Sequence, residues 1–295
     1  MNVGSITDHD LFTGVLYAGC GLMGRFFPYV GGKSALIPKL LTYIPRHDTY
    51  IEVFGGSGEL LFSKNRSKTE VYNDINGDLA NLFIVVRDNV EEFLERTQYL
   101  IHSREIHERW SNEFKNGIHP DDPIDRASRF YYILSTQFAG KMYGGWAFGK
   151  YRRYWDNSDL KKINAIHKRL LGVQVEGVDF RRLIKTWDDS EVFYFLDPPY
   201  LDTADYKLGF SKEDHKELAD VLSSVSGKWL LTVGDHPYMY ELYGEYSIEK
   251  AEQRLSLGIA DERTENTFTN LIIRNYDLGY KSQSTFLRPG VWGVV

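Results

Sequence analysis

Short apolar runs recur along the chain, and each stops at glycine or at a polar residue. Such runs, separated by segments of helical periodicity, are typical of an open α/β sheet. The run at residues 191–196 is nearly all apolar, which indicates a central parallel strand covered on both faces. The pattern predicts strands at residues 50–54, 70–73, 174–178, 191–196, 228–233 and 271–274. It predicts helices at residues 59–64, 79–86 and 211–224.

The middle of the chain has a different pattern. From about residue 89 to residue 171 it is helical and rich in aromatic residues, without a clear strand alternation. Because this stretch interrupts an alternating strand–helix order, it indicates an inserted domain. We predict one domain made of residues 1–82 and 172–295, and an inserted domain at residues 83–171.

Composition narrows the class of protein. The chain has 295 residues, a net charge of −6 and one cysteine, Cys20, which excludes an internal disulfide and a Cys-rich zinc site. No apolar run approaches the ~18 residues of a membrane span. The first ten residues carry two acids and no basic residue, so no secretory signal is expected. The eight histidines are scattered. We therefore expect a cytoplasmic protein that binds neither a membrane nor a metal.

Basic and aromatic residues gather between residues 141 and 185. This segment holds eleven Lys and Arg residues against four Asp and Glu residues, a local charge of +7. Two interpretations stay open from composition: a solvated helix face, or a face that binds phosphate groups. Tyr143, Trp146 and Tyr151 favour the second, because rings beside basic side chains can stack on bases.

A glycine-rich turn, residues 55–58, follows the first predicted strand. Glycine lets the backbone turn tightly and approach a ligand, which in α/β sheets lies outside the carboxyl ends of the strands. Asp74 ends the next strand, where an acid can bind a ribose diol or cap a helix. Residues 31–34 are similar to the end of a phosphate loop, but Phe27 stands where that loop needs glycine, so no NTPase is predicted. Lys33 remains a cation for a nearby site.

The most specific motif is Asp197-Pro-Pro-Tyr200, directly after the buried strand at residues 191–196. An acid at the end of a central strand lies where α/β active sites form. Pro198 and Pro199 have no N–H donor and leave rigid carbonyl acceptors, and Tyr200 adds a flat ring. A carboxylate, rigid carbonyls and an aromatic plate can hold a planar group that bears an NH2.

Asp-Pro-Pro-Tyr with an upstream Phe-x-Gly-x-Gly turn resembles the S-adenosylmethionine-dependent amino-methyltransferases. The closest resemblance is to the Dam-type (alpha-group, D12 class) DNA adenine-N6 methyltransferases. The resemblance runs from residue 26 onward and implies a Rossmann-like methyltransferase sheet with an inserted, mainly helical DNA-recognition domain. The segments that carry it are residues 27–33, 51–58, 73–76, 137–140, 146–151, 177–180, 197–200 and 271–276.

The resemblance implies a role for each of these segments. Asp197, Pro198, Pro199 and Tyr200 would hold a flipped adenine and form the catalytic site. The residues expected to bind S-adenosylmethionine, with S-adenosylhomocysteine as product, are Tyr29, Lys33, Glu52, Phe54, Gly55, Gly56, Ser57, Gly58, Asp74, Asp179, Phe180 and Asp197. Those expected to bind duplex DNA are Lys141, Tyr143, Trp146, Lys150, Arg152 and Arg153.

Several points stay open from the sequence. The segment at residues 140–146 is shorter than the family's usual hairpin arm, which argues against a GATC target. An RNA or protein-glutamine amino-methyltransferase could use the same clamp, and a degenerate relative could bind DNA without catalysis. The resemblance further implies a bacterial, archaeal or phage-infected cell, association with the nucleoid, a monomer, and a cognate restriction endonuclease as an optional partner.

Overall fold

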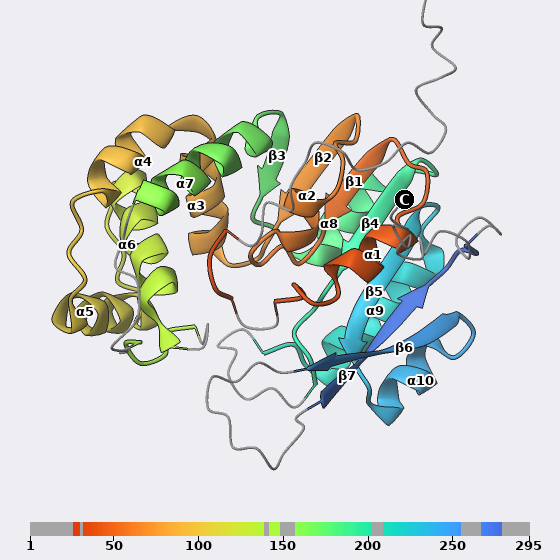
Figure 1. Ribbon diagram of the computed structural model, residues 1–295. Coiled ribbons are helices and arrows are strands. Elements are labelled where there is room, and N and C mark those ends of the chain that lie inside the picture. Colours follow the sequence, from red (N-terminus) through yellow and green to blue (C-terminus); the bar gives the residue numbers. More distant parts are fainter. Residues whose placement is uncertain are drawn as a thin grey trace, which may run out of the picture.

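The computed structural model describes residues 26–29, 32–138, 142–147, 157–201, 209–254 and 267–278. Its centre is a seven-stranded sheet with the order β3-β2-β1-β4-β5-β7-β6 (Figure 1). The first five strands are parallel, whereas β7 runs antiparallel to both β5 and β6. The strands are β1 (Thr49–Glu52), β2 (Thr69–Asn73), β3 (Val173–Glu176), β4 (Val192–Leu196), β5 (Lys228–Gly234), β6 (Ser247–Arg254) and β7 (Thr267–Arg274).

Side-chain alternation along the strands builds two separate cores. In β4, Phe193 and Phe195 pack on one face of the sheet, and Tyr194 and Leu196 pack on the other. The first face is covered by α1 (Ile37–Tyr43), α2 (Glu59–Ser63) and α3 (Gly77–Asp88). The second is covered by α8 (Phe180–Trp187), α9 (Lys212–Ser224) and α10 (Pro237–Tyr243). Because both faces are covered, the central strand is apolar throughout, as the sequence predicts.

A layer of helices separates β2 from β3 in the chain. After α3 come α4 (Val90–Thr97), α5 (Arg104–Lys115), α6 (Pro123–Thr136) and α7 (Asn157–Leu170). Figure 1 shows these helices gathered at one end of the molecule, beside the β3 edge of the sheet. Among the described residues, helices therefore occupy the stretch for which an inserted domain is predicted. The boundary predicted at residue 82 lies within α3, which runs on to Asp88 and packs against both α6 and α7.

The described residues include elements that the sequence pattern did not predict. The helices α1, α8 and α10 and the edge strand β6 were not expected. The predicted strands and helices all occur, with ends displaced by a few residues. No helix in the described part of the chain is long and apolar enough to cross a membrane.

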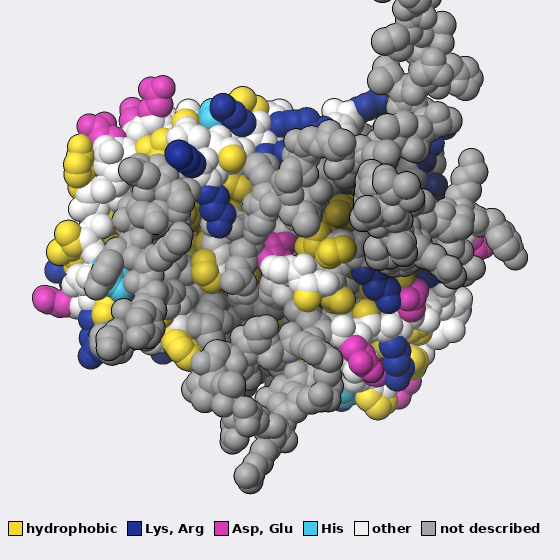
Figure 2. Space-filling view, in the orientation of Figure 1, with side chains coloured by type: hydrophobic (Ala, Val, Ile, Leu, Met, Phe, Trp, Pro, Cys, Tyr) yellow, Lys and Arg dark blue, Asp and Glu magenta, His cyan; other side chains and the backbone are white. Residues whose placement is uncertain are grey.

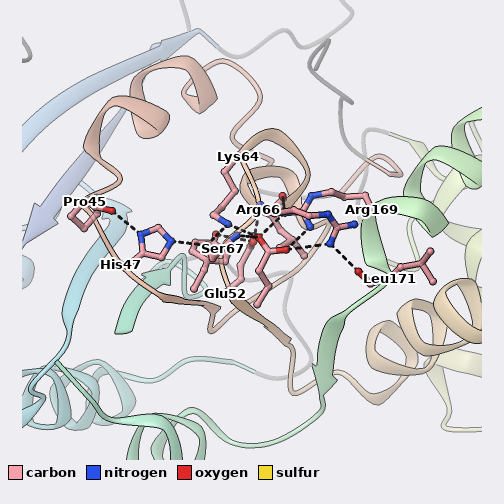
Figure 3. A network of polar contacts seen from close by, with 11 residues as sticks. Pro45, His47, Glu52, Lys64, Arg66, Ser67, Arg169 and Leu171 are labelled. Atoms are coloured by element: carbon pink, nitrogen blue, oxygen red, sulfur yellow. Dashed lines mark hydrogen bonds and ion pairs between the residues drawn. The ribbon is translucent and has the colours of Figure 1, made fainter. Parts of the chain in front are cut away.

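A buried polar network fastens the helical layer to the sheet (Figure 3). Glu70 in β2 accepts hydrogen bonds from Arg169 in α7, at 2.5 and 2.8 Å, and from Lys64 at 2.5 Å. Burial opposes ionisation of Glu70, but these hydrogen bonds and charges outweigh it and hold its pKa below the usual value. Arg169 also donates to the carbonyl of Leu61 at 2.7 Å, so one side chain joins α7, β2 and α2.

Candidate active site

A cavity of about 890 Å³ opens at the carboxyl ends of β1 and β4. The strand order reverses between these two parallel strands, which is where open α/β sheets bind their ligands. Its wall comes from the sheet ends and, on one side, from the helical layer through Lys115, Met142, Tyr143 and Gly144. Of the residues predicted to bind the cofactor or to act in catalysis, all line this cavity except Gly58.

The turn after β1 is shaped by its glycines. A Cβ on Gly55 would lie 2.2 Å from the ring of Tyr72, so no side chain fits there. Gly56 and Gly58 have φ values of +49° and +69°, in the left-handed region that favours glycine. Gly58 is the N-cap residue of α2 and does not line the cavity. The turn thereby brings bare backbone to the cavity.

Asp74 lies at the end of β2, beside this turn. Its carboxylate accepts hydrogen bonds from the backbone N–H of Gly56 at 2.9 Å and of Asn76 at 2.8 Å. Burial raises the pKa of Asp74 to about 6, against these hydrogen bonds. The sequence left open whether Asp74 binds a ribose or caps a helix. The N-cap of α3 is Asn76, whose side chain accepts a hydrogen bond from the Asp78 N–H. Asp74 is therefore free of the capping role and faces the cavity as an acceptor.

Glu52 ends β1 and is 2% exposed. Its Oε2 accepts from the Tyr50 hydroxyl and from the backbone N–H of Leu61, both at 3.0 Å. Burial raises the pKa of Glu52 to about 8, so at neutral pH the side chain is mainly protonated. Glu52 lines the cavity as a mainly neutral group.

Asp197 follows β4 and is held by several donors. Lys33 Nζ lies 2.9 Å from its Oδ2, and Thr232 Oγ1 donates to its Oδ1 at 2.7 Å. The Tyr200 hydroxyl lies 3.5 Å from the same Oδ1, but its one proton is donated to Asn270. A carboxylate has about four acceptor positions, so capacity remains on Asp197 for a ligand N–H. Lys33, predicted beside the cofactor's methionine end, thus lies against the Asp197 carboxylate.

Tyr200 is fixed by both its ring and its hydroxyl. The ring stacks on Phe268 with centroids 5.7 Å apart and planes 12° apart. The hydroxyl donates to Asn270 Oδ1 at 2.7 Å, and Lys33 Nζ lies 4.7 Å from the ring centroid. These contacts hold a flat ring beside Asp197 in one orientation.

Aromatic rings line one end of the cavity. Phe54, Phe180 and Phe210 lie with centroids 5.5 to 5.8 Å apart. Asp179 caps α8 by accepting from Arg181 N–H at 2.9 Å, and its carboxylate pairs with the Arg181 side chain. His215, 1% exposed, contacts Phe210, and burial lowers its pKa to about 4, which the nearby Pro199 carbonyl only partly offsets. This end therefore offers an apolar slot with one carboxylate at its rim.

The residues predicted to bind DNA are only partly described. Tyr143 lines the cavity with a positive φ of 54°, and burial together with Asp78 raises the pKa of its hydroxyl well above the usual value. Trp146 pairs with Gln137 in an antiparallel bridge, and its ring lies 4.9 Å from that of His102 with the two planes tilted by 39°. The other four predicted contacts lie outside the described residues: Lys141, Lys150, Arg152 and Arg153.

The structure corrects the phosphate-binding interpretation for two of the basic residues between 141 and 185. Arg169 is 7% exposed and pairs with Glu70, so it faces the core. Arg181 pairs with Asp179, Asp214 and Glu217. The charge count could not reveal this, because three of the four carboxylate partners, Glu70, Asp214 and Glu217, lie outside the counted segment.

Comparison with known protein families decides the identity. The family model of the D12 class N6 adenine-specific DNA methyltransferases matches residues 29–257, which is most of the chain. The chain belongs to this family. The match spans both the strands that form the cavity and the helical insertion, so the sheet is a Rossmann-like methyltransferase fold.

Curated relatives carry consistent names. Type II methyltransferase M.CviBI of Paramecium bursaria Chlorella virus NC1A is 29% identical, over 83% of this chain and 97% of the relative. Type II methyltransferase M1.LlaDCHI of Lactococcus lactis is 27% identical, over 85% and 95%. DNA adenine methylase of Escherichia coli is 23% identical, over 66% and 74%.

The cavity of this D12 methyltransferase fits S-adenosylmethionine, whose use the family implies in general. Its volume suits a ligand of that size together with a base. The bare turn at Gly55 and Gly56 admits close backbone contact, Asp74 offers acceptors for hydroxyl groups, and the phenylalanine slot accepts a flat ring. Among the described residues, no cluster of His, Cys, Asp or Glu could hold a metal ion.

Sequence reasoning missed several residues that shape this site. Asn73 donates to the carbonyls of Val53 and Val178 and accepts from Val178 N–H, which ties together the segments that follow three strands. Thr232 and Asn270 hold Asp197 and Tyr200. A signal for Thr232 existed, because it is the one hydroxyl within the apolar strand at residues 228–233.

Proposed function

We propose that this D12 methyltransferase transfers a methyl group from S-adenosylmethionine to N6 of an adenine at a specific sequence in duplex DNA. One observation carries the proposal: the Asp197–Tyr200 turn and the glycine turn of β1 line the same cavity. A base cannot reach such a cavity while stacked in a duplex, so the adenine is flipped out of the helix.

The cofactor brings a methyl group on a positively charged sulfur. Its methionine end would lie against the turn from Gly55 to Ser57 and near Lys33, and Asp74 would accept the ribose hydroxyls. Asp179 and Phe180 would hold the adenine ring. The rings of Tyr29 and Phe54 would face the positive sulfur, where an aromatic face attracts a cation. Glu52 completes this wall as a mainly neutral group.

The flipped adenine would be held by the Asp197–Tyr200 turn. Asp197 and the Pro198 carbonyl would each accept one N–H of the amine, which draws the nitrogen lone pair out of conjugation with the ring. Pro199 keeps the turn rigid, and Tyr200 would stack on the base. Because Thr232 and Lys33 already fix Asp197, the remaining acceptor position is set before the base arrives. Orientation and preorganised charge supply the catalysis.

The duplex would lie across the helical side of the cavity mouth. Tyr143 and Trp146, with Lys141, Lys150, Arg152 and Arg153, are the proposed contacts. Figure 2 shows acidic side chains at the upper left of this face, over α4, whereas basic side chains lie along its upper middle part. The exposed acids of α4 are Glu91, Glu92 and Glu95. Phosphates should avoid that end, and DNA affinity should fall steeply with salt.

Transfer of labelled methyl from S-adenosylmethionine to mixed-sequence duplex DNA tests the proposal. We expect label on adenine N6, and a loss of about 10²-fold or more in Asp197→Ala, which removes a positioned acceptor. An unchanged circular-dichroism spectrum of the variant is the control, because Asp197 is also expected to contact the cofactor. Label on RNA or protein instead of DNA would mean a different amino substrate. Cofactor binding without transfer to any of these would mean a degenerate DNA-binding relative.

Mapping the labelled sites would also give the recognition sequence, for which the short hairpin argues against GATC. We further propose a monomer that acts in the cytoplasm, on the nucleoid. A cognate restriction endonuclease is proposed as an optional partner. Resistance of DNA from expressing cells to a panel of endonucleases would identify the cleavage site that such a partner shares.

A further inference from the structure

Glu59 is a buried carboxylate in the cavity wall that the proposed function leaves without a role. It is the first residue of α2, directly after Gly58, and is 7% exposed. Its Oε1 accepts a hydrogen bond from Ser34 Oγ at 2.7 Å. Its Oε2 is buried and has no hydrogen-bond partner among the described residues.

Such an arrangement is unfavourable unless a partner arrives. Burying a carboxylate costs several kcal/mol unless it is paired with a cation or with enough N–H and O–H donors. Glu59 has a single neutral donor, and no Lys or Arg of the described residues forms an ion pair with it. The missing partner is therefore a positively charged donor that is not part of the described protein.

The other carboxylates of the cavity are already engaged. Asp197 is paired with Lys33, and Asp179 is paired with Arg181. Asp74 accepts two backbone N–H groups, and Glu52 accepts two hydrogen bonds and is mainly neutral at pH 7. Glu59 is thus the cavity carboxylate that has the greatest remaining capacity for a cationic donor.

The surroundings of Glu59 fit the methionine end of the cofactor. Glu59 follows the turn at residues 55–58 without a gap in sequence, and a Cβ on Gly32 would lie 3.3 Å from its Oε1. Gly32 precedes Lys33, so both segments assigned to the methionine end meet at this carboxylate. The α-ammonium group of that methionine is a compact cation with three N–H donors, as an unpaired carboxylate requires.

We propose that Glu59 binds the α-ammonium group of S-adenosylmethionine, an assignment that rests on the proposed function. The carboxylate accepts one or two of the ammonium N–H bonds while Ser34 keeps its side chain in place. Glu59 then selects ligands that carry a free amino group, whereas other residues of the cavity hold the ribose and the adenine.

Binding of two ligands to three proteins tests this proposal. The ligands are S-adenosylhomocysteine, which has the α-amino group but no charged sulfur, and its analogue without that amino group. The proteins are the wild type, the near-isosteric Glu59→Gln and the control Glu92→Gln, an exposed acid of α4 whose change should alter neither affinity, each measured by calorimetry without DNA. We expect Glu59→Gln to weaken S-adenosylhomocysteine about tenfold or more, because a charge-assisted hydrogen bond is lost. Its affinity for the analogue should equal that of the wild type.

The other outcomes separate the possible failures. Equal weakening of both ligands by Glu59→Gln would overturn the assignment, because Glu59 would then act only on the shape of the site. An affinity of Glu59→Gln for S-adenosylhomocysteine equal to that of the wild type would also overturn it, because no bond to the amino group would then have been lost. A wild type that binds neither ligand would refute the proposed function itself. Should Glu59→Gln unfold, Glu59→Asp gives the same comparison with a shortened carboxylate and an intermediate loss.

Discussion

The buried guanidinium of Arg169 allows a quantitative test of how the helical layer is held to the sheet. It donates two hydrogen bonds to Glu70 and one to the carbonyl of Leu61 (Figure 3). Arg169→Met keeps an unbranched apolar side chain but removes all three donors. We expect the variant to fold with a clearly lower free energy of unfolding.

The magnitude follows from the burial of the network. Removing one partner of a buried ion pair costs about 3–5 kcal/mol, because the other charge stays buried without compensation. Lys64 remains 2.5 Å from Glu70 and limits this penalty. The Leu61 carbonyl loses a donor, which adds about 1 kcal/mol. The expected loss is therefore about 3 kcal/mol.

Urea unfolding followed by circular dichroism measures this loss by linear extrapolation. Lys68→Met is the matched control, since Lys68 is 75% exposed and pairs with Asp48 at 2.6 Å on the surface. An exposed pair contributes about 0–1 kcal/mol, so the control should stay close to the wild type. A loss below 1 kcal/mol in Arg169→Met, equal to that of the control, would refute the reasoning about the network.

Two further predictions concern pH. Asp74 has a pKa of about 6, so if its carboxylate accepts the ribose hydroxyls, affinity for S-adenosylhomocysteine should fall as pH drops below 6. Asp74→Asn should bind more weakly at pH 7.5 and show no such decline in calorimetry. The pKa of His215 is about 4 in the folded protein and 6.5 in the unfolded chain. The unfolded chain therefore binds a proton first on acidification, and the wild type should lose stability as the pH falls. Relative to His215→Gln, urea unfolding should show an extra loss of up to about 3 kcal/mol between pH 7 and pH 4.

The sequence allowed the sheet to be predicted because its strands are buried on both faces. Continuous apolar runs such as residues 191–196 have no other good explanation in a chain of this composition. The edge strand β6 was missed because it lacks such a continuous apolar run. It reads Ser-Ile-Glu-Lys-Ala-Glu-Gln-Arg and is held by pairing with β7, so it shows no apolar run. The helices α1 and α10 are both only seven residues long, too short for a helical period to stand out.

The site residues at turns were the easiest to identify, because glycine and proline leave clear signals there. Residues that act from inside a strand or helix leave weaker ones. Glu59 reads as an ordinary acid in the first turn of a helix, where such acids are favourable. Only the three-dimensional arrangement shows that it is buried, lines the cavity and lacks a partner. The roles of Arg169 and Arg181 could not be predicted, because their carboxylate partners meet them only on folding.

The point of insertion explains how the helical layer comes to lie beside the cavity. The chain leaves the sheet after Asp74, at the carboxyl end of β2, passes through α3 into the helical layer, and returns through α7 to the edge strand β3. The layer is thus inserted next to β2, the neighbour of β1, and Met142 and Tyr143 reach the cavity without interrupting the parallel sheet. The Arg169–Glu70 contact fastens the returning helix to the same strand. Asp74 ends this strand and accepts a hydrogen bond from the Gly56 N–H of the glycine turn, so β2 contacts both the returning helix and the cavity.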